Sequence, residues 1–213
     1  MDPKRVVETG YDAVSFAYRA DDAPDDDYGE WLGELADDLP AGAKVLDLGS
    51  GCGVPAARWL VAHGYDVTGV DLSSVQIRRA KELVPDARFV CADMSRIRFP
   101  ARSFDAVIAL YSLIHLPLSE QQEVIRSIRT WLRPGGRLLA IVGAGAWTGT
   151  EEDWLGSGAA MWWSNEEIAT YLRWLSESGF EVLRNRFVPE DDSGHKPRSR
   201  PRDGVGGRGV IDR

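Results

Sequence analysis

The sequence has few of the features that membrane, secreted or metal-binding proteins require. No apolar run in its 213 residues approaches the roughly 20 residues of a transmembrane helix. Residues 1–9 are polar and charged, unlike a secretory signal. The two cysteines, Cys52 and Cys91, are too few for a disulfide framework, and no metal-ligand spacing surrounds them. We therefore expect a cytoplasmic protein with no membrane partner and no metal site.

Basic residues are scarce relative to acidic ones. The net charge is −8, and several of the bases gather after His195, so the preceding part of the chain is more acidic still. An acidic surface repels phosphate backbones, which argues against DNA or RNA as a partner. The composition, 44% hydrophobic and 27% charged, is typical of globular proteins, and the length suits one compact domain. We expect a monomer or a homodimer.

Strands and helices are predicted to alternate from residue 44 onward. Helical spacing is found at 55–63, and capping-box patterns predict further helices that open at Ser73, Ser119 and Ser164. Short apolar runs that predict strands lie between the helices, at Lys44–Leu48, Asp66–Val70, Arg88–Cys91, Phe104–Tyr111, Arg137–Val142 and Phe180–Val188. The alternation predicts parallel strands joined by crossover helices, and so an α/β fold with a doubly wound, mostly parallel sheet.

The chain divides into three expected parts. Residues 1–43 are predicted to be helical, with a break near Pro24, and residues 44–194 form the α/β domain. Residues 195–213 are basic and contain almost no apolar side chains, so we expect this tail to be disordered.

The residues suited to ligand binding follow the carboxyl ends of the predicted strands, where open α/β sheets bind ligands. The turn Gly49–Gly53 lets the backbone approach a ligand closely. Asp71 ends the second strand and can accept hydrogen bonds from both hydroxyls of a ribose. Asp93 follows the third strand and can accept a hydrogen bond from an adenine amino group, with Leu72 and Met94 against the ring faces. The pattern therefore predicts an adenosine-containing ligand.

The glycine pattern separates two kinds of nucleotide site. A dinucleotide site has the pattern G-x-G-x-x-G, but Val54 stands at the third glycine position. Asp47 precedes the glycines, where it would repel a pyrophosphate and suit the ammonium group of an amino acid. Both features argue against the main alternative, an NAD-dependent oxidoreductase.

Four motifs in order identify a family resemblance: VLDLGSGCG at 45–53, VTGVDLS at 67–73, CADM at 91–94, and LRPGG at 132–136 after FDAVIALYSLIHL at 104–116. Over roughly Tyr11 to Val188 the chain resembles the class I S-adenosylmethionine-dependent methyltransferases of the small-molecule type (the type 11/25 group). The resemblance implies a Rossmann-like sheet in the order 3-2-1-4-5-7-6, S-adenosyl-L-methionine as cofactor, and a small-molecule acceptor. After Val188 no apolar strand is evident, so we expect strand seven to be missing or altered.

The resemblance also implies roles for residues by their position in the motifs. The methionine part of the cofactor would be held by Asp47, Gly49, Ser50, Gly51, Cys52 and Gly53. Asp71 would bind the ribose. The adenine would be framed by Leu72, Gln76, Asp93 and Met94, and the region beside the methyl group by Leu110, Tyr111 and His115. The N-terminal segment, with Tyr11 and Tyr18, would fold over the pocket as a lid.

Methyl transfer needs mainly the correct placement of the acceptor. A base is required only where the acceptor must lose a proton, and His115 is the first candidate because its ordinary pKa is near neutrality. Tyr11 and Tyr18 are candidates for orienting the acceptor. His115 has two alternative roles, lining the cofactor pocket or capping a helix. Four tryptophans either form an acceptor wall or only cover the sheet: Trp147, Trp154, Trp162 and Trp163.

Two alternative functions remain beside small-molecule methyl transfer. One is the NAD-dependent oxidoreductase, which the glycine pattern disfavours. The other is a non-catalytic protein that binds S-adenosylmethionine, which the motifs alone do not separate from an enzyme. Methylation of nucleic-acid bases or of glutamine is disfavoured because the Asn-Pro-Pro-Tyr type signature is absent after the fourth strand, where the chain reads Ala-Leu-Tyr-Ser at 109–112.

Overall fold

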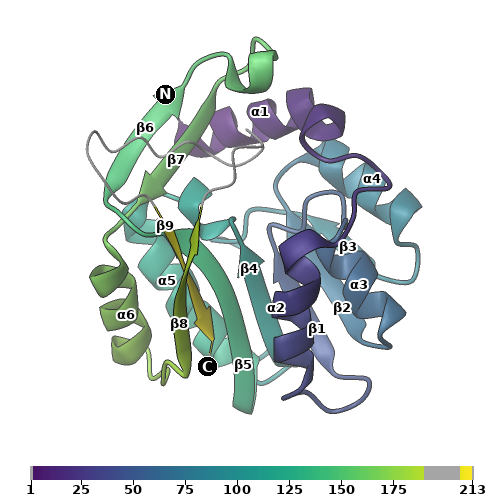
Figure 1. The fold of residues 1–213 in the computed structure, drawn as a ribbon, viewed down its shortest axis with the longest axis vertical. Coiled ribbons are helices and arrows are strands. Elements are labelled where there is room, and N and C mark those ends of the chain that lie inside the picture. The colour runs from purple at the N-terminus through teal and green to yellow at the C-terminus, as the bar shows by residue number, and fades with distance from the viewer. Residues whose placement is uncertain (1, 190–206, 213) are drawn as a thin grey trace.

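A seven-stranded sheet forms the centre of the computed structural model, which describes residues 2–189 and 207–212 (Figure 1). The strands are β1 (Lys44–Leu48), β2 (Asp66–Asp71), β3 (Arg88–Cys91), β4 (Phe104–Leu110), β5 (Leu132–Gly143), β8 (Arg184–Pro189) and β9 (Gly207–Asp212). Their order is β3-β2-β1-β4-β5-β9-β8; the first five are parallel to one another, and β9 is antiparallel to both of its neighbours. The predicted doubly wound, mostly parallel α/β fold is therefore confirmed.

Helices cover both faces of this sheet. They are α1 (Pro3–Tyr18), α2 (Asp26–Ala36), α3 (Ala56–Ala62), α4 (Ser74–Leu83), α5 (Leu118–Trp131) and α6 (Ile168–Glu177), with short 3-10 turns at Leu113–His115 and Trp154–Gly156. Successive residues of β1 face opposite layers: Val45 packs with α2, α3 and α4, whereas Leu46 packs with α5 and α6. Both side chains are fully buried, which explains why the strand reads as a continuous apolar run.

Of the two alternatives for strand seven, missing or altered, the first is wrong, and residues 207–212 of the tail that was expected to be disordered form a strand. Strand β9 occupies the place of strand seven, between β5 and β8. The physical reason is the need of β5 for a partner, because the backbone groups along an uncovered strand edge are costly. The strand is not recognisable in the sequence, because it begins with Gly207, Arg208 and Gly209 and has no apolar run. It can form all the same, since strands pair through backbone hydrogen bonds. The remainder of the predicted tail, residues 195–206 and 213, lies outside the described residues.

The predicted helix starts hold at Ser73 and, to within one residue, at Ser119, but not at Ser164. The Ser73 hydroxyl caps α4 by accepting a hydrogen bond from the Gln76 amide at 3.1 Å. Helix α5 begins one residue before Ser119, after Pro117, with no side-chain cap. Ser164 lies in a strand and not at a helix start, because residues 147–165 form a hairpin that the sequence pattern did not indicate.

This hairpin and the N-terminal helix lie beyond the carboxyl ends of the central strands (Figure 1). Its strands are β6 (Trp147–Glu151) and β7 (Met161–Asn165), paired antiparallel with Trp147 opposite Asn165. Helix α1 packs on β7 and on α4. The N-terminal segment is broken into α1 and α2 as predicted, and α1 and the hairpin together enclose the edge of the sheet where parallel strands place their ligand-binding residues.

Candidate active site

A cavity of about 790 Å³, counting the part open to solvent, lies at the carboxyl edge of β1, β2 and β4 beneath α1. Most of the predicted site residues line it: Tyr11, Tyr18, Asp47, Gly49, Ser50, Gly51, Cys52, Asp71, Leu72, Gln76, Met94, Leu110, Tyr111 and His115. Two predicted residues, Gly53 and Asp93, do not. The sequence motifs thus converge on one site, although they lie far apart along the chain.

The glycine turn after β1 has positive φ angles and close neighbours that disfavour any residue with a Cβ. Gly49 has φ +78°, and a Cβ placed on it would lie 2.2 Å from the Cβ of Ser112. Gly53 has φ +77°, and its missing Cβ leaves room for Phe89 and Val84 on the side away from the cavity. Gly49 therefore keeps the turn tight against β4, and Gly53 keeps it packed against the sheet.

Asp71 ties this turn to the end of β2. Its Oδ2 accepts a hydrogen bond from the Gly51 amide at 2.8 Å, and its Oδ1 accepts one from the Ser73 amide at 2.9 Å. Burial raises the pKa of Asp71 to about 6, although these backbone hydrogen bonds favour the charged form and oppose the shift; the negative charge of Asp12 adds to it. Each carboxylate oxygen has two lone pairs, so the same carboxylate can also accept hydrogen bonds from a ligand.

Asp47 is the most unusual group of the site. Its residue is 2% exposed, and its Oδ2 has no hydrogen-bond partner among the described residues. Burial, followed by the negative charge of Asp71, raises the pKa of Asp47 to about 7. A buried carboxylate without a partner is costly in the free protein, and a cation with N–H donors satisfies it. The ammonium group of an amino acid has the charge and the donors that this position requires.

His115 forms a fixed pair with Tyr11. Its Nδ1 lies 2.9 Å from the carbonyl oxygen of Trp162, and its Nε2 lies 2.9 Å from the Tyr11 hydroxyl. A carbonyl only accepts, so Nδ1 carries the proton, and Nε2 of the neutral ring accepts from Tyr11. Burial lowers the pKa of His115 to about 4, against the opposing effect of the Trp162 carbonyl, and burial also raises the pKa of Tyr11 well above its ordinary value. Both side chains are therefore neutral near pH 7.

The predicted tryptophans lie behind the cavity wall. Trp154 packs edge-to-face on Tyr11 with ring centroids 5.3 Å apart, and Trp163 packs on Trp154 at 5.8 Å. Both are buried, and neither these two nor Trp147 and Trp162 line the cavity. Of the two predicted roles, the structure favours covering: the indoles pack the hairpin against α1 and so support Tyr11 from outside.

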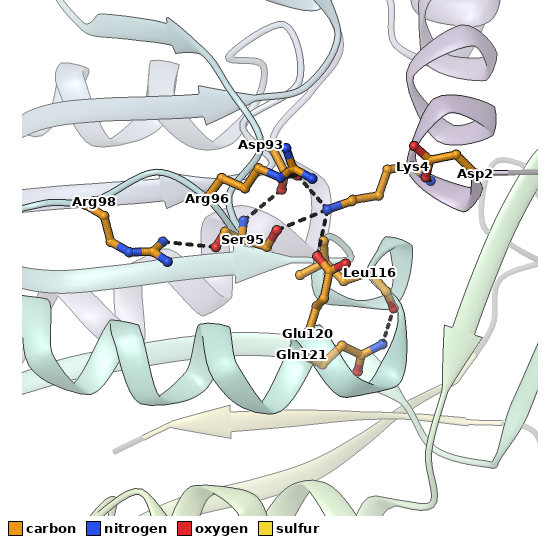
Figure 2. Close-up of polar contacts among 9 residues, drawn as sticks. All are labelled: Asp2, Lys4, Asp93, Ser95, Arg96, Arg98, Leu116, Glu120 and Gln121. Atoms are coloured by element: carbon orange, nitrogen blue, oxygen red, sulfur yellow. Dashed lines mark hydrogen bonds and ion pairs between the residues drawn. The ribbon is translucent and has the colours of Figure 1, made fainter.

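Asp93 is engaged with α1 (Figure 2). Its Oδ2 lies 2.6 Å from the Lys4 Nζ, and its Oδ1 accepts from the Ser95 amide at 2.8 Å. Lys4 also contacts Glu120 of α5 at 2.7 Å. Burial alone raises the pKa of Asp93, but the hydrogen bonds from Lys4 and Ser95 outweigh it and lower the pKa below its ordinary value. Lys4 thus joins α1, α5 and the segment after β3 outside the cavity. The role of Asp93 toward an adenine stays a prediction.

Several residues of the cavity were given no role by sequence reasoning. Ser112 follows β4 and donates a hydrogen bond to the carbonyl of Leu48 at 2.5 Å, which closes the turn region. Arg19 and Tyr28 lie at the C-terminal end of α1 and in α2, and belong to no motif. The remaining ones are Val7, Val54, Pro55 and Ala56. Only Ser112 had a usable signal, because it directly follows a predicted strand.

A family model described as a methyltransferase domain matches residues 45–136. In sequence, the chain is 42% identical over 106 residues to 27-O-demethylrifamycin SV methyltransferase of Amycolatopsis mediterranei, covering 47% of this chain and 38% of the relative. It is 33% identical over 179 residues to a sterol 24-C-methyltransferase of Gibberella zeae, covering 75% of this chain and 45% of the relative. The chain thus spans less than half the length of either relative.

Two solved structures share this fold. Magnesium protoporphyrin IX methyltransferase of Synechocystis, solved with bound S-adenosylmethionine, superimposes with a TM-score of 0.69 at 19% identity, covering 100% of this chain and 97% of that one. A 1,6-didemethyltoxoflavin-N1-methyltransferase of Burkholderia thailandensis superimposes with a TM-score of 0.70 at 20% identity, covering 98% and 86%. Within the described residues, no helix is long and apolar enough to cross a membrane, and no group of acids, histidines and cysteines is arranged to hold a metal ion.

Proposed function

Because the chain belongs to the class I S-adenosylmethionine-dependent methyltransferases, we propose that it transfers a methyl group from S-adenosylmethionine to a small molecule. One observation carries this proposal. Among the described residues, the buried Oδ2 of Asp47 has no hydrogen-bond partner, and it lies beside a glycine turn that Asp71 fixes, in a cavity walled by aromatic side chains. These groups match the cationic amino-acid end and the ribose of the cofactor.

Different residues of the cavity suit different parts of the cofactor, from its amino-acid end to its adenine. Asp47 would accept hydrogen bonds from the ammonium group, and the turn Gly49–Gly53 would lie against the methionine chain. Asp71 would accept from the ribose hydroxyls with the lone pairs that Gly51 and Ser73 do not use. The adenine would lie against Leu72 and Met94, both of which line the cavity. Gly53 and Asp93 do not line the cavity. Gly53 would act on it by shaping the turn, and Asp93 by holding α1 in place through Lys4.

When bound, the cofactor supplies an electrophilic methyl group on a positively charged sulfur. The protein then has to hold the acceptor in line and exclude water, and such placement accounts for much of the rate of reactions between bound partners. Tyr11 lines the cavity and donates to His115. An acceptor hydroxyl placed at Tyr11 would pass its proton to the Tyr11 oxygen as the Tyr11 proton moves to His115 Nε2. His115 remains the proposed base, acting through Tyr11, with Tyr18 orienting the acceptor.

The acceptor side favours a small, largely apolar molecule. Tyr11, Tyr18, Tyr28 and Tyr111 all line the cavity, and the net charge of −8 disfavours a nucleic acid. The two relatives are named for methylation at oxygen and at carbon, so the acceptor atom is not set by family. The Tyr11–His115 pair favours oxygen.

Calorimetry with S-adenosylhomocysteine and with NADH tests the cofactor. We expect S-adenosylhomocysteine alone to bind, and Asp71→Asn to weaken it at least tenfold, because one charged acceptor is lost. Transfer of a labelled methyl group from S-adenosylmethionine into a small-molecule extract then separates an enzyme from a binding protein. Binding of NADH alone would contradict the family assignment, and binding without label transfer would contradict the activity.

Tyr11→Phe and His115→Gln test the proton path. Removing one member of a general-base pair costs about 10²-fold or more in kcat. We expect a similar loss in both variants and no further loss in the double variant, because the two act as one unit. Tyr65→Phe is the matched control, since Tyr65 does not line the cavity and its hydroxyl donates to the Ala36 carbonyl. If both variants stay within about threefold of the wild type, His115 is not the base and placement alone drives the transfer.

A further inference from the structure

A buried glutamine of α5, Gln121, lies behind His115 and belongs to no sequence motif. It is in the first turn of the helix, its residue is 0% exposed, and it does not line the cavity. Figure 2 shows its side chain turned back toward Leu116, the residue that follows His115. A buried amide is costly unless its donors and its acceptor are paired, so its partners show which elements it holds together.

Each polar atom of the Gln121 side chain has a partner. Its Nε2 donates to the carbonyls of Leu116 and Ser164, both at 2.8 Å, and its Oε1 accepts from the Tyr171 hydroxyl of α6 at 2.7 Å. Burial raises the pKa of Tyr171, so this hydroxyl keeps the proton that it donates. Since the two carbonyls only accept and the tyrosine donates, the amide has one possible orientation.

Gln121 and His115 bind the same strand. The Trp162 carbonyl of β7 accepts from His115 Nδ1 at 2.9 Å, and the Ser164 carbonyl, two residues further along, accepts from Gln121. Carbonyls two residues apart in a strand point to the same side. His115 ends the 3-10 turn Leu113–His115, and the next residue, Leu116, supplies the second carbonyl that Gln121 binds. Gln121 therefore bridges the strand and the turn between which His115 lies.

The contact of His115 with the Trp162 carbonyl decides which ring nitrogen carries the proton. While Nδ1 donates to this carbonyl, Nε2 accepts from the Tyr11 hydroxyl. If the carbonyl moves away from Nδ1, the neutral ring loses its preference for this tautomer. In the other tautomer Nε2 carries the hydrogen and cannot accept a further proton. The spacing between β7 and the turn therefore controls the proton path.

We propose that Gln121 is a positioning residue, which keeps the Trp162 carbonyl on His115 Nδ1 by tying β7 to the turn. The inference rests on the proposed function, in which His115 takes a proton through Tyr11. Gln121 suits this task because one –NH₂ group supplies two donors to two carbonyls, whereas a methionine has a similar length and no donor. A hydrogen bond of ordinary net strength corresponds to a change of roughly three- to tenfold in the ratio of two tautomers.

Long-range proton–nitrogen NMR of the free protein reads the tautomer directly, because protonated and unprotonated ring nitrogens have well-separated nitrogen shifts. The chain has three histidines, His63, His115 and His195, and the spectrum of His115→Gln assigns the relevant signal. We expect the Nδ1–H form in the wild type. In Gln121→Met we expect the ratio of the Nδ1–H form to the Nε2–H form to fall roughly three- to tenfold.

Tyr171→Phe is the matched control. It removes the hydroxyl that binds Gln121 Oε1 and leaves both donors of Gln121 in place. Both variants should lower the urea midpoint of unfolding, because each breaks the same buried network, but only Gln121→Met should shift the tautomer ratio. If Gln121→Met does not fold, the double variant with Tyr171→Phe replaces it, since removing both side-chain partners together is less costly. An unchanged ratio without Gln121, or an equal shift in Tyr171→Phe, would overturn the proposal.

Methyl transfer gives a second readout, which separates the proposal from the proposed function. With saturating labelled S-adenosylmethionine, Gln121→Met should slow transfer into the small-molecule extract by a factor similar to the tautomer shift. Its affinity for S-adenosylhomocysteine should stay within about twofold of the wild type, because Gln121 does not line the cavity. A shifted tautomer with an unchanged rate would support the positioning by Gln121 and remove His115 from the proton path. A slower rate with an unshifted tautomer would overturn the proposal and leave the proposed function standing.

Discussion

Affinity for S-adenosylhomocysteine should depend on the protonation of Asp47, and we expect it to fall about tenfold between pH 8 and pH 6. The pKa of Asp47 is raised to about 7, chiefly by burial and then by the charge of Asp71. At pH 8 about nine tenths of the free protein has a charged Asp47, and at pH 6 only about one tenth. The ammonium group of the ligand stays positive over this range and binds the charged form.

Proton release gives a second, independent measurement of the same effect. Calorimetry at pH 6 in two buffers of different ionisation enthalpy should show nearly one proton released on binding, and at pH 8 only about a tenth of one. Asp47→Asn should bind more weakly at pH 8 and lose this pH dependence. The control ligand 5′-methylthioadenosine lacks the ammonium group and should report only the weaker titration of Asp71, whose pKa is about 6.

The sign of the stability effect follows from the same shift. A carboxyl group whose pKa is raised by folding stabilises the folded state while it is protonated, and this contribution is lost as the pH rises through the folded value. The free protein should therefore lose stability between pH 4 and pH 8, by up to about 4 kcal/mol from Asp47. An affinity that is flat from pH 6 to pH 8, with no proton released at pH 6, would refute the placement of the ammonium group at Asp47.

Two further predictions concern the turn and the N-terminal helix. Gly49→Ala should lower the free energy of unfolding by about 2–4 kcal/mol in urea titrations and abolish cofactor binding, because the new Cβ would meet Ser112 at 2.2 Å. The control is Gly64→Ala, which has φ +84° but open space around the new Cβ and should lower the free energy of unfolding by only about 1 kcal/mol. Equal losses in the two variants would contradict the steric argument. Lys4→Met should raise hydrogen–deuterium exchange across residues 3–18 and speed release of S-adenosylhomocysteine several-fold, because the ties to Asp93 and Glu120 are lost. Lys44→Met removes only an exposed 4.0 Å pair and should change neither; unchanged exchange in both variants would contradict the role of these ties.

The central sheet and the glycine turn are predictable from sequence because their signals are local. Lys44–Leu48 and Arg88–Cys91 are apolar or mixed runs bounded by breakers, and their predicted bounds match the structure. The positions at the strand ends follow from topology alone, since parallel strands bring their carboxyl ends to one edge. This is why the sequence places Asp47 and Asp71 in one site, although they lie 24 residues apart in the chain and a crossover helix separates their strands.

The rest depends on contacts that no local pattern carries. Strand β9 forms because it pairs with the edge of β5, and its own composition does not indicate a strand. In the sequence, β6 and β7 are only an aromatic segment that contains glycine. Their pairing depends on the packing of Trp163 against Trp154 behind α1, which no local pattern indicates. Arg19 reaches the cavity because α1 ends beside Tyr28, a placement set by tertiary packing. Sequence patterns thus found most of the residues that line the cavity but gave no role to Arg19 and Tyr28.

The position of β9 has a consequence for synthesis of the protein on the ribosome. Its backbone pairs with β5 on one side and β8 on the other, and β8 joins the sheet only through it in the part of the chain that is described. The rest of the sheet and its crossover helices can assemble first, while the outer edge of β5 waits for residues 207–212 to emerge. Until then the nascent chain exposes an unpaired edge, and that interval is when it is most open to chaperones and to pairing with the wrong strand.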